Sequence, residues 1–170
     1  HSSAASDVYK RQILVLQNEI NNIKEIIDGA HHKKMKIVFN PAPFNNEILS
    51  YDLNKISTLI LNQTEGEALT KEKKPVNILR VLNSKFNNTE IILTLGEKGS
   101  LYSFKDELLK IKAHKVDTVD TTGAGDTFIG YYVAGIASKM NKKDNLKRAS
   151  KAAAIATTKL GGAGSIPRIN

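Results

Sequence analysis

Cysteine and tryptophan are absent from the 170 residues of this sequence. Without cysteine the chain can form neither a disulfide scaffold nor a thiolate metal site, and this composition suits a reducing cytosol. No apolar run approaches the roughly 18 residues of a membrane span. A G-x-x-x-x-G-K-[ST] loop is also absent, which argues against a Walker-type nucleotide fold. We therefore expect a cytoplasmic protein that does not act in a membrane.

Acidic residues are in the minority, because 17 Asp and Glu oppose 25 Lys and Arg and give a formal net charge of +8. Such an excess can indicate nucleic-acid binding, but recognition requires clustered basic residues with stacking or base-reading groups. The basic residues are spread along the sequence, for example at Lys33, Lys34, Lys71, Lys73, Lys74, Lys139, Lys142 and Lys143. We interpret them as solvated helix ends and expect no nucleic-acid partner.

The length suits one domain. Residues 1–11 show no apolar periodicity and no secretory pattern, so we interpret them as a non-native lead-in of linker or cloning origin. Residues 12–170 then form the domain to be explained.

From residue 12 onward, strand patterns and helix patterns alternate. Short apolar runs predict strands at 13–16, 36–40, 58–61 and 90–95. Apolar residues at helical spacing predict helices at 20–30, 65–69 and 76–86, and later at 125–140 and 146–160. Strands at 100–104 and 111–116 are predicted as antiparallel additions at the sheet edge. The alternation predicts an α/β fold with a mostly parallel sheet, and in such sheets ligands bind beyond the carboxyl ends of strands.

Polar residues follow three of the predicted strands. Glu19 comes after the first strand, and an Asn-Pro-Ala-Pro segment, 40–43, comes after the second. Asn62 and Glu65 come after the third, at the spacing of a helix capping box. Each has a simpler structural interpretation: a solvated loop acid, a proline that stops a strand, and a helix cap. The residues alone leave these alternatives open.

The stretch Asp120-Thr121-Thr122-Gly123-Ala124-Gly125-Asp126 combines a turn, a helix start and a carboxylate. Glycines at 123 and 125 allow a backbone to approach a ligand closely. The unpaired N–H groups and macrodipole of the following helix favour an anion. Asp126 stands where it could accept a proton from a hydroxyl. Plain helix capping is the alternative for a Gly-rich turn followed by Asp.

Together with Thr127, Phe128 and Gly130, this heptapeptide is similar to the signature of the ribokinase family of carbohydrate and nucleoside kinases, the PfkB family. The order of the other segments also resembles the carboxyl-terminal part of that family over about 12–167. Those segments are Gln17-x-Glu19, Asn40 to Pro43, Asn62-x-x-Glu65, Thr94-Leu-Gly96, and Gly161 to Pro167.

The resemblance implies a ribokinase-like three-layer α/β/α fold and transfer of the γ-phosphoryl group of ATP to a sugar hydroxyl, O5 of D-ribose. It implies that Asp126 is the catalytic base and contacts the substrate, and that Glu19 holds a sugar hydroxyl. The backbone amides of Gly123, Ala124, Gly125 and Asp126 would form the anion hole, which stabilises charge on the transferred group.

The resemblance also implies a set of nucleotide and metal ligands. The residues implied for ATP are Asn62, Thr94, Gly96, Gly99 and Ser150. Mg²⁺ and its waters would be ordered by Asn62 and Glu65, a type of site that suits this ion. The residues implied around K⁺ are Asp120, Thr122, Ala156, Lys159, Gly161 and Ser165. A structural interpretation remains for the glycines, namely turns at Gly96 and Gly99 and a helix C-cap at Gly161.

A second Gly-Gly sugar-recognition loop, a sugar-contacting Asp and a small β lid belong to the family pattern and are not found in this sequence. We therefore expect an amino-terminal half and lid to be missing, and the chain alone to be inactive. The alternatives are a kinase of another sugar or a nucleoside, a noncatalytic nucleotide-binding module and, last, nucleic-acid binding. A homodimer of the full-length protein is left open.

Overall fold

The computed structural model describes residues 12–169. Two compact units divide the chain. Among the described residues, the amino-terminal unit contains 12–94 together with Tyr102–Leu108, and the carboxyl-terminal unit contains Leu95–Leu101 and 109–169. The predicted lead-in at 1–11 lies outside the described residues and stays a prediction.

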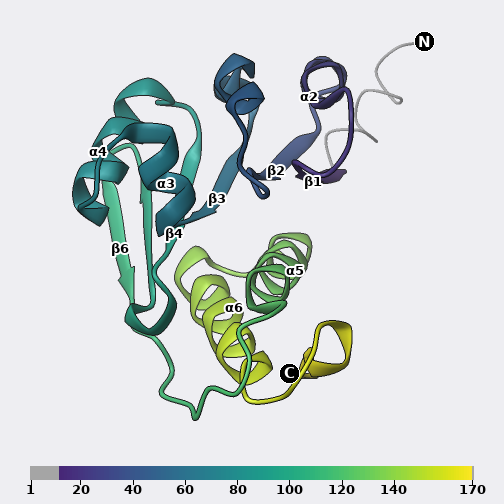
Figure 1. The fold of residues 1–170 in the computed structure, drawn as a ribbon. Helices are drawn as coiled ribbons and strands as arrows, with labels where there is room; N and C mark the ends of the chain where they lie inside the picture. The colour runs from purple at the N-terminus through teal and green to yellow at the C-terminus, as the bar shows by residue number, and fades with distance from the viewer. Residues whose placement is uncertain (1–11, 170) are drawn as a thin grey trace. The chain divides into compact units, whose positions relative to one another are not determined.

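Six strands form one sheet in the order β1-β2-β3-β4-β5-β6 (Figure 1). The first four are β1 (Ile13–Gln17), β2 (Lys36–Asn40), β3 (Thr58–Asn62) and β4 (Glu90–Thr94). They pair in parallel, as their continuous apolar runs predict. Gln17 is the register partner of Asn40, and Asn62 is the partner of Thr94. The pairing therefore gathers the polar strand ends at the carboxyl edge of the sheet.

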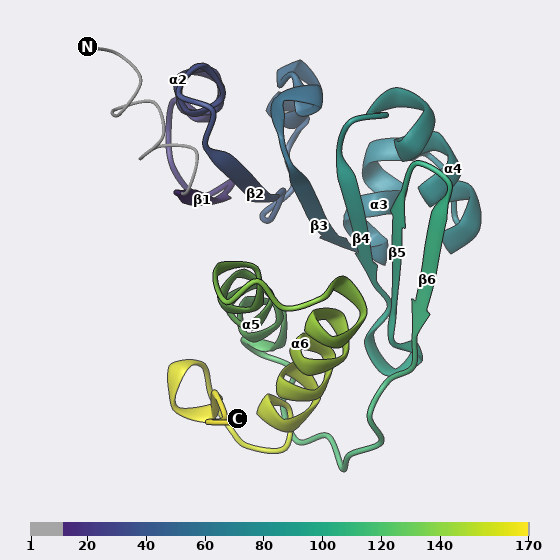
Figure 2. The same cartoon turned by 180° about the vertical axis from the view of Figure 1, so that it is seen from behind.

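Helices connect the parallel strands, since a parallel pair requires a crossover. Their bounds are α2 (Ile23–His32), α3 (Gln63–Thr70) and α4 (Pro75–Lys85), and two short 3-10 helices, η1 (Asn46–Ser50) and η2 (Leu53–Lys55), join β2 to β3. Helix α3 packs against α4 beside β4 (Figure 2). Within residues 12–169, no helix is long and apolar enough to cross a membrane.

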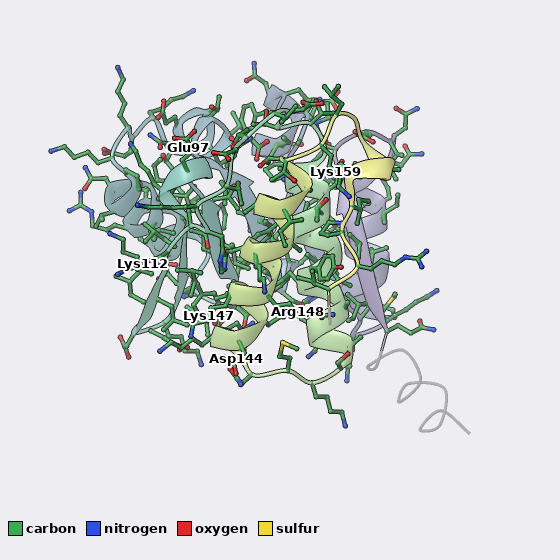
Figure 3. The ribbon with its side chains drawn as sticks, turned by 90° about the horizontal axis from the view of Figure 1, so that it is seen from below. Glu97, Lys112, Asp144, Lys147, Arg148 and Lys159 are labelled. Carbon is green, nitrogen blue, oxygen red and sulfur yellow. The ribbon has the colours of Figure 1, made fainter. Side chains whose placement is uncertain are left out.

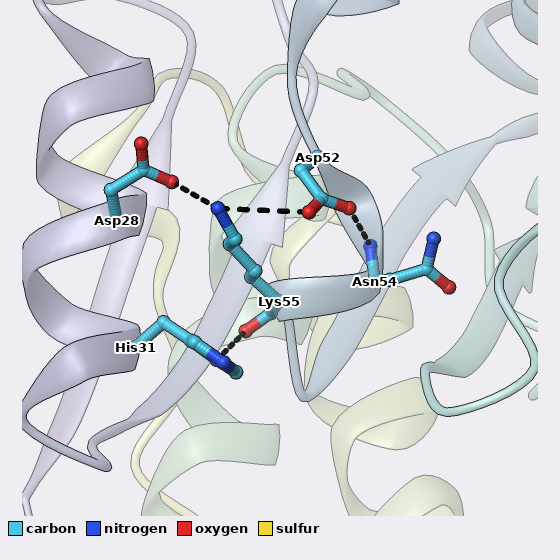
Figure 4. Close-up of polar contacts among 5 residues, drawn as sticks. All are labelled: Asp28, His31, Asp52, Asn54 and Lys55. Atoms are coloured by element: carbon cyan, nitrogen blue, oxygen red, sulfur yellow. Dashed lines mark hydrogen bonds and ion pairs between the residues drawn. The ribbon is translucent and has the colours of Figure 1, made fainter.

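A polar cluster fastens α2 to η2 (Figure 4). Lys55 Nζ lies 2.7 Å from Asp28 Oδ1 and 3.6 Å from Asp52 Oδ2, and His31 Nδ1 lies 3.3 Å from the Lys55 carbonyl oxygen. The hydrogen bond from Lys55 lowers the pKa of Asp28. Exposed ion pairs contribute little to folding, so we expect this cluster to add little to the stability of the unit.

A hairpin of β5 (Ser100–Phe104) and β6 (Glu107–Ile111) extends the sheet beyond β4. The antiparallel addition is confirmed, but the strand predicted at 111–116 is wrong, because β6 ends at Ile111. Only Lys105 and Asp106 separate the strands, and Lys105 adopts a left-handed φ of 52°. Such a short turn fixes the register. Strand β6 pairs with β5 and lies last in the strand order of the sheet.

The carboxyl-terminal unit contains α5 (Ala124–Ala137) and α6 (Lys142–Ala156). Both helices were predicted, but α5 ends earlier than the expected residue 140, and α6 begins before the expected residue 146. Asn141 explains the early start, since its Oδ1 accepts the Asp144 N–H at 3.0 Å. Asparagine is a favoured N-cap residue, and the apolar pattern alone overlooked it.

Helices α5 and α6 pack closely at Gly135. A Cβ on Gly135 would lie 1.9 Å from Asn145 Oδ1. Asn145 is 1% exposed, and its Nδ2 donates to the Tyr132 carbonyl at 2.9 Å. Ala149 and Ala152 are fully buried, and their small side chains permit the close packing of the two helices.

We predict that Gly135→Ala destabilises the fold by about 1–3 kcal/mol, because the new methyl group must displace a buried side chain. Gly130→Ala is the matched control on the same helix. A Cβ there would meet nothing within 4 Å, so this change should be neutral or stabilising by up to about 1 kcal/mol. Urea unfolding of the two variants and the parent protein measures each change in the free energy of unfolding. Equal effects of the two substitutions would contradict this account of the helix contact.

Candidate functional site

The turn before α5 has the geometry of a helix start that can receive an anion. Gly123 is the N-cap residue with φ 78°, which favours glycine, and its carbonyl accepts the Thr127 N–H at 2.9 Å. A Cβ on Gly123 would lie 3.6 Å from the Gly162 Cα. Asp126 lies exposed in the first turn of α5, where the helix macrodipole favours a negative charge.

The amides of this turn are not all equivalent. The first N–H groups of a helix have no partner within it, yet the Ala124 N–H donates to the Thr121 carbonyl at 3.2 Å. Among residues 12–169, no backbone acceptor pairs with the N–H of Gly123 or Gly125. Among the predicted anion-hole amides, that of Ala124 is therefore already engaged within the turn, whereas those of Gly123 and Gly125 have no such backbone partner.

Asp120 ties this turn to the segment that follows α6. Its Oδ1 accepts the Thr122 N–H at 2.9 Å, and its Oδ2 accepts the Gly161 N–H at 3.0 Å. The N–H groups of Val119 and Asp120 donate to the Thr157 carbonyl at 2.8 and 3.0 Å. Hydrogen bonds from Thr122, and then from Gly161, lower the pKa of Asp120 because they stabilise its charged form.

The residues expected around a monovalent cation occupy the same unit as Asp120. Ala156 is the last residue of α6, Gly161 has φ 80°, and Ser165 is buried with its Oγ donating to the Gly162 carbonyl at 2.7 Å. Helix ends leave carbonyl oxygens without helical partners. One carboxylate with several carbonyls fits a hard cation, and the described residues contain no group of three or more His, Cys, Asp or Glu that could hold a metal instead.

In the amino-terminal unit, Asn62 and Glu65 form the capping box of α3. Asn62 Oδ1 accepts the Glu65 N–H, while Glu65 Oε2 accepts the Asn62 N–H, each at 2.9 Å. Glu65 Oε1 also accepts from Asn62 Nδ2 at 2.9 Å. Hydrogen bonds therefore position both oxygens of this carboxylate. The helix cap that the spacing of Asn62 and Glu65 predicted is present.

Burial raises the pKa of Glu65, against the opposing hydrogen bonds from Asn62 and the Asn40 side chain. Glu65 is 8% exposed, so its ionised form loses much of its hydration. Hard oxygen ligands fit Mg²⁺, which usually keeps several waters. A carboxylate that already accepts from Asn62 can still accept a hydrogen bond from a metal-bound water, so the cap and a metal role are compatible.

Glu19 lies in an exposed turn after β1. Its neighbour Asn18, which the sequence interpretation passed over, is buried and joins two loops. The Asn18 N–H donates to the Ala42 carbonyl at 3.0 Å, and its Nδ2 donates to the Pro43 carbonyl at 2.8 Å. Asn18 Oδ1 accepts from the Tyr51 hydroxyl at 3.3 Å. A polar residue directly after a predicted strand was the available indication.

The expected nucleotide residues fall in both units. Thr94 ends β4, with its Oγ1 3.4 Å from the Leu61 carbonyl oxygen, and Ser150 lies half-buried on α6. Gly99 has φ 92°, and a Cβ there would lie 2.0 Å from the Ile111 carbonyl oxygen. The turn interpretation of Gly99 is therefore confirmed. Gly96 also has a left-handed φ of 57°, but a Cβ there would meet nothing within 4 Å.

Comparison with known proteins gives consistent matches. The sequence pattern of the pfkB family carbohydrate kinase matches residues 3–169. The chain is 32% identical over 165 residues to a ribokinase of Lactococcus lactis, which covers 96% of this chain and 53% of that protein. It is 33% identical over 177 residues to a deoxyribokinase of Salmonella typhi, covering 98% of this chain and 56% of that protein.

A solved structure of a ribokinase from Cryptococcus neoformans, in complex with ADP, superposes with a TM-score of 0.82 at 29% identity. The match covers 92% of this chain and 57% of that one. This likeness confirms the predicted ribokinase-like α/β/α fold class. The chain spans about half the length of the curated relatives it matches.

Proposed function

Because the chain belongs to the pfkB family of carbohydrate kinases, we propose that it forms part of an ATP-dependent enzyme that phosphorylates a sugar hydroxyl. The observation that carries this proposal is the turn at 120–126. It combines a left-handed Gly123 and available amides with the exposed carboxylate of Asp126 at the start of α5. The ADP in the Cryptococcus neoformans ribokinase supports ATP as cosubstrate.

The proposed substrate is D-ribose, phosphorylated at O5. Relatives named ribokinase and deoxyribokinase support a pentose, and a kinase of another sugar or a nucleoside is the second candidate. A noncatalytic nucleotide-binding module is the third. ADP release by the intact gene product with ribose, deoxyribose and adenosine as acceptors distinguishes the first two candidates. Nucleotide binding without ADP release would favour the module. Cytoplasmic location and the missing amino-terminal half remain predictions, and homodimerisation of the full-length protein is left open as before.

In the proposed reaction, the sugar hydroxyl oxygen forms a bond to the γ-phosphorus while the bond to the β-γ bridging oxygen breaks. Asp126 accepts the hydroxyl proton. The amides of Gly123 and Gly125, with those of Ala124 and Asp126, donate to the transferred group as negative charge builds on its oxygens. Glu19 would hold another sugar hydroxyl, and Thr94, Gly96, Gly99 and Ser150 would contact the nucleotide.

Two cations are part of the proposal. Asn62 and Glu65 would hold Mg²⁺ through its waters, and this ion would neutralise phosphate charge. The oxygens of Asp120 and Ser165, with backbone oxygens of Thr122, Ala156, Lys159 and Gly161, would hold K⁺. Asp120 also accepts the Thr122 N–H. A cation that fixes the Asp120 carboxylate would therefore also fix the turn that carries the anion-hole amides.

We predict that Asp126→Asn in the intact gene product lowers kcat for ribose phosphorylation by about 10²–10⁴-fold, because the variant cannot accept the proton. ATP binding should persist, since the amides of the turn are unchanged. Asp117→Asn is the control, because Asp117 is an exposed carboxylate outside the turn. A kcat for Asp126→Asn equal to that of the control would remove Asp126 from the mechanism.

For Glu65, two substitutions separate the cap from the metal role. Glu65→Gln keeps one oxygen that can accept the Asn62 N–H but loses the second acceptor, which takes the Asn62 Nδ2 hydrogen bond. It should therefore lose less stability than Glu65→Ala, while the Mg²⁺ concentration needed for activity rises. Glu65→Ala should raise the same requirement and also lose stability, by about 0.5–2 kcal/mol for a lost cap. Magnesium titrations and thermal unfolding measure the two effects. A normal magnesium requirement in Glu65→Gln would leave Glu65 as a helix cap alone.

For Asp120, we predict that Asp120→Ala abolishes activation by K⁺ and accelerates hydrogen exchange at the Thr122 and Gly161 amides, whose acceptor is removed. Rates are compared in potassium, sodium and a bulky organic cation at matched ionic strength. Asp117→Ala is the control for loss of a negative charge. Faster exchange with undiminished potassium activation would show that Asp120 orders the turn without binding the ion.

A further inference from the structure

A hollow of about 650 Å³ lies within the carboxyl-terminal unit. One wall is the end of β6 with the segment after it, residues 110–114, and the other is α6. Met140 and Ile169 also line it, and with Ile111 and Ala113 they give it an apolar part. This volume lies within the usual range for small-molecule sites.

The hollow is strongly basic. Six of its lining residues are Lys or Arg: Lys110, Lys112, Lys143, Lys147, Arg148 and Lys151. His114 also lines the hollow, and Asp144 (Figure 3) is the single carboxylate among the described lining residues. Asp144 is hydrogen-bonded to the side chain of the cap residue Asn141. Within residues 12–169, no ion pair to a carboxylate neutralises any of the six cations.

Arg148 is held in place but incompletely satisfied. Its guanidinium lies 5.0 Å from the centre of the Tyr131 ring, and Nη2 lies 3.4 Å from the Ile169 carbonyl oxygen. The Tyr131 hydroxyl donates to the Pro167 carbonyl and accepts the Ile169 N–H. Arg148 Nε is buried and has no hydrogen-bond partner in the described structure. Such an orphaned donor is costly to bury, and an acceptor that reached it from the hollow would satisfy it.

Like charges also line up along α6. Lys143, Lys147 and Lys151 are spaced four residues apart, so they share one helix face, where neighbouring like charges destabilise a helix. A bound anion would relieve this repulsion. We infer that the hollow binds a small polyanion, a molecule that carries two or more adjacent phosphate groups.

A small ligand fits better than a nucleic acid. A single-stranded nucleic acid is held by a groove that follows its backbone and by aromatic side chains that stack on its bases. The lining residues include no Phe, Tyr or Trp. The basic groups instead converge from two segments of the chain around one hollow.

The hollow is separate from the proposed catalytic residues. Its lining includes none of the residues assigned above to the nucleotide, the sugar or either cation. Ser150 lies between Lys147 and Lys151 in the sequence but is not among the lining residues. Binding there can therefore be tested without reference to kinase activity.

The test uses the intact gene product, labelled with ¹⁵N and titrated with inorganic tripolyphosphate. We expect the amide resonances of 110–114 and 143–151 to shift, and calorimetry to report one site in addition to any binding at the 120–126 turn. Lys147→Gln with Lys151→Gln should weaken this site by about 10-fold or more, equivalent to about 1.4 kcal/mol. Lys73→Gln with Lys85→Gln removes the same charge from exposed positions elsewhere and should leave the site unchanged.

Thermal unfolding provides a second measurement. Tripolyphosphate should raise the Tm of the parent protein more than that of the Lys147 and Lys151 double variant, because a ligand that binds the native state stabilises it. Uridine triphosphate distinguishes the ligand sources: tighter binding at the same amides indicates a nucleotide, and equal binding indicates phosphate groups alone. Shifts confined to 120–126, or equal weakening in both double variants, would overturn the inference. Tighter binding of a 20-nucleotide single-stranded DNA at the same amides would also overturn it.

Discussion

The carboxyl-terminal unit depends on the close contact between α5 and α6. Gly135 leaves space for the buried side chain of Asn145, and fully buried alanines continue the contact along α6. This packing brings the end of α6 back to the beginning of α5. The Thr157 carbonyl then accepts the N–H groups of Val119 and Asp120, and Asp120 accepts from Gly161. The turn at 120–126 is therefore held by the end of the packed helix α6 and the segment that follows it.

Much of the parallel sheet could be predicted from the sequence, because buried strands are continuous apolar runs and the helices between them repeat with a different period. The hairpin was placed less well. Its register depends on the turn at Lys105 and Asp106, where a left-handed Lys105 has no local pattern to mark it. The start of α6 was missed for a related reason. Asn141 begins the helix through one side-chain hydrogen bond, and the spacing of apolar residues carries no information about such a cap.

The candidate site could be named from the sequence only through the family resemblance, since each residue alone had a structural interpretation of equal or greater weight. The structure shows several of those interpretations to be real. Glu65 is a buried cap, Gly99 is required by the close approach of Ile111, and Asp120 orders a turn. A structural role does not compete with a catalytic one here, because a ligand group must be held rigidly before it can position a phosphate or a metal. Asn18, which carries no charge, was missed because its role consists entirely of contacts between loops.

The spatial grouping of the basic residues also could not be predicted from the sequence. Along the sequence the basic residues are dispersed, and dispersed lysines are normally solvated. In the folded chain, lysines from β6 and α6, separated by about thirty positions, line one hollow together with Arg148. The close pairing of α5 with α6 gives α6 its position, and Asn141 sets where its first turn begins. Net charge alone could not show whether the basic residues are scattered over the surface or grouped around one hollow, because their grouping depends on how the helices and strands pack. The grouping of these basic residues around one hollow therefore depends on how α6 packs, and the segment that follows α6 also holds the turn at Asp120.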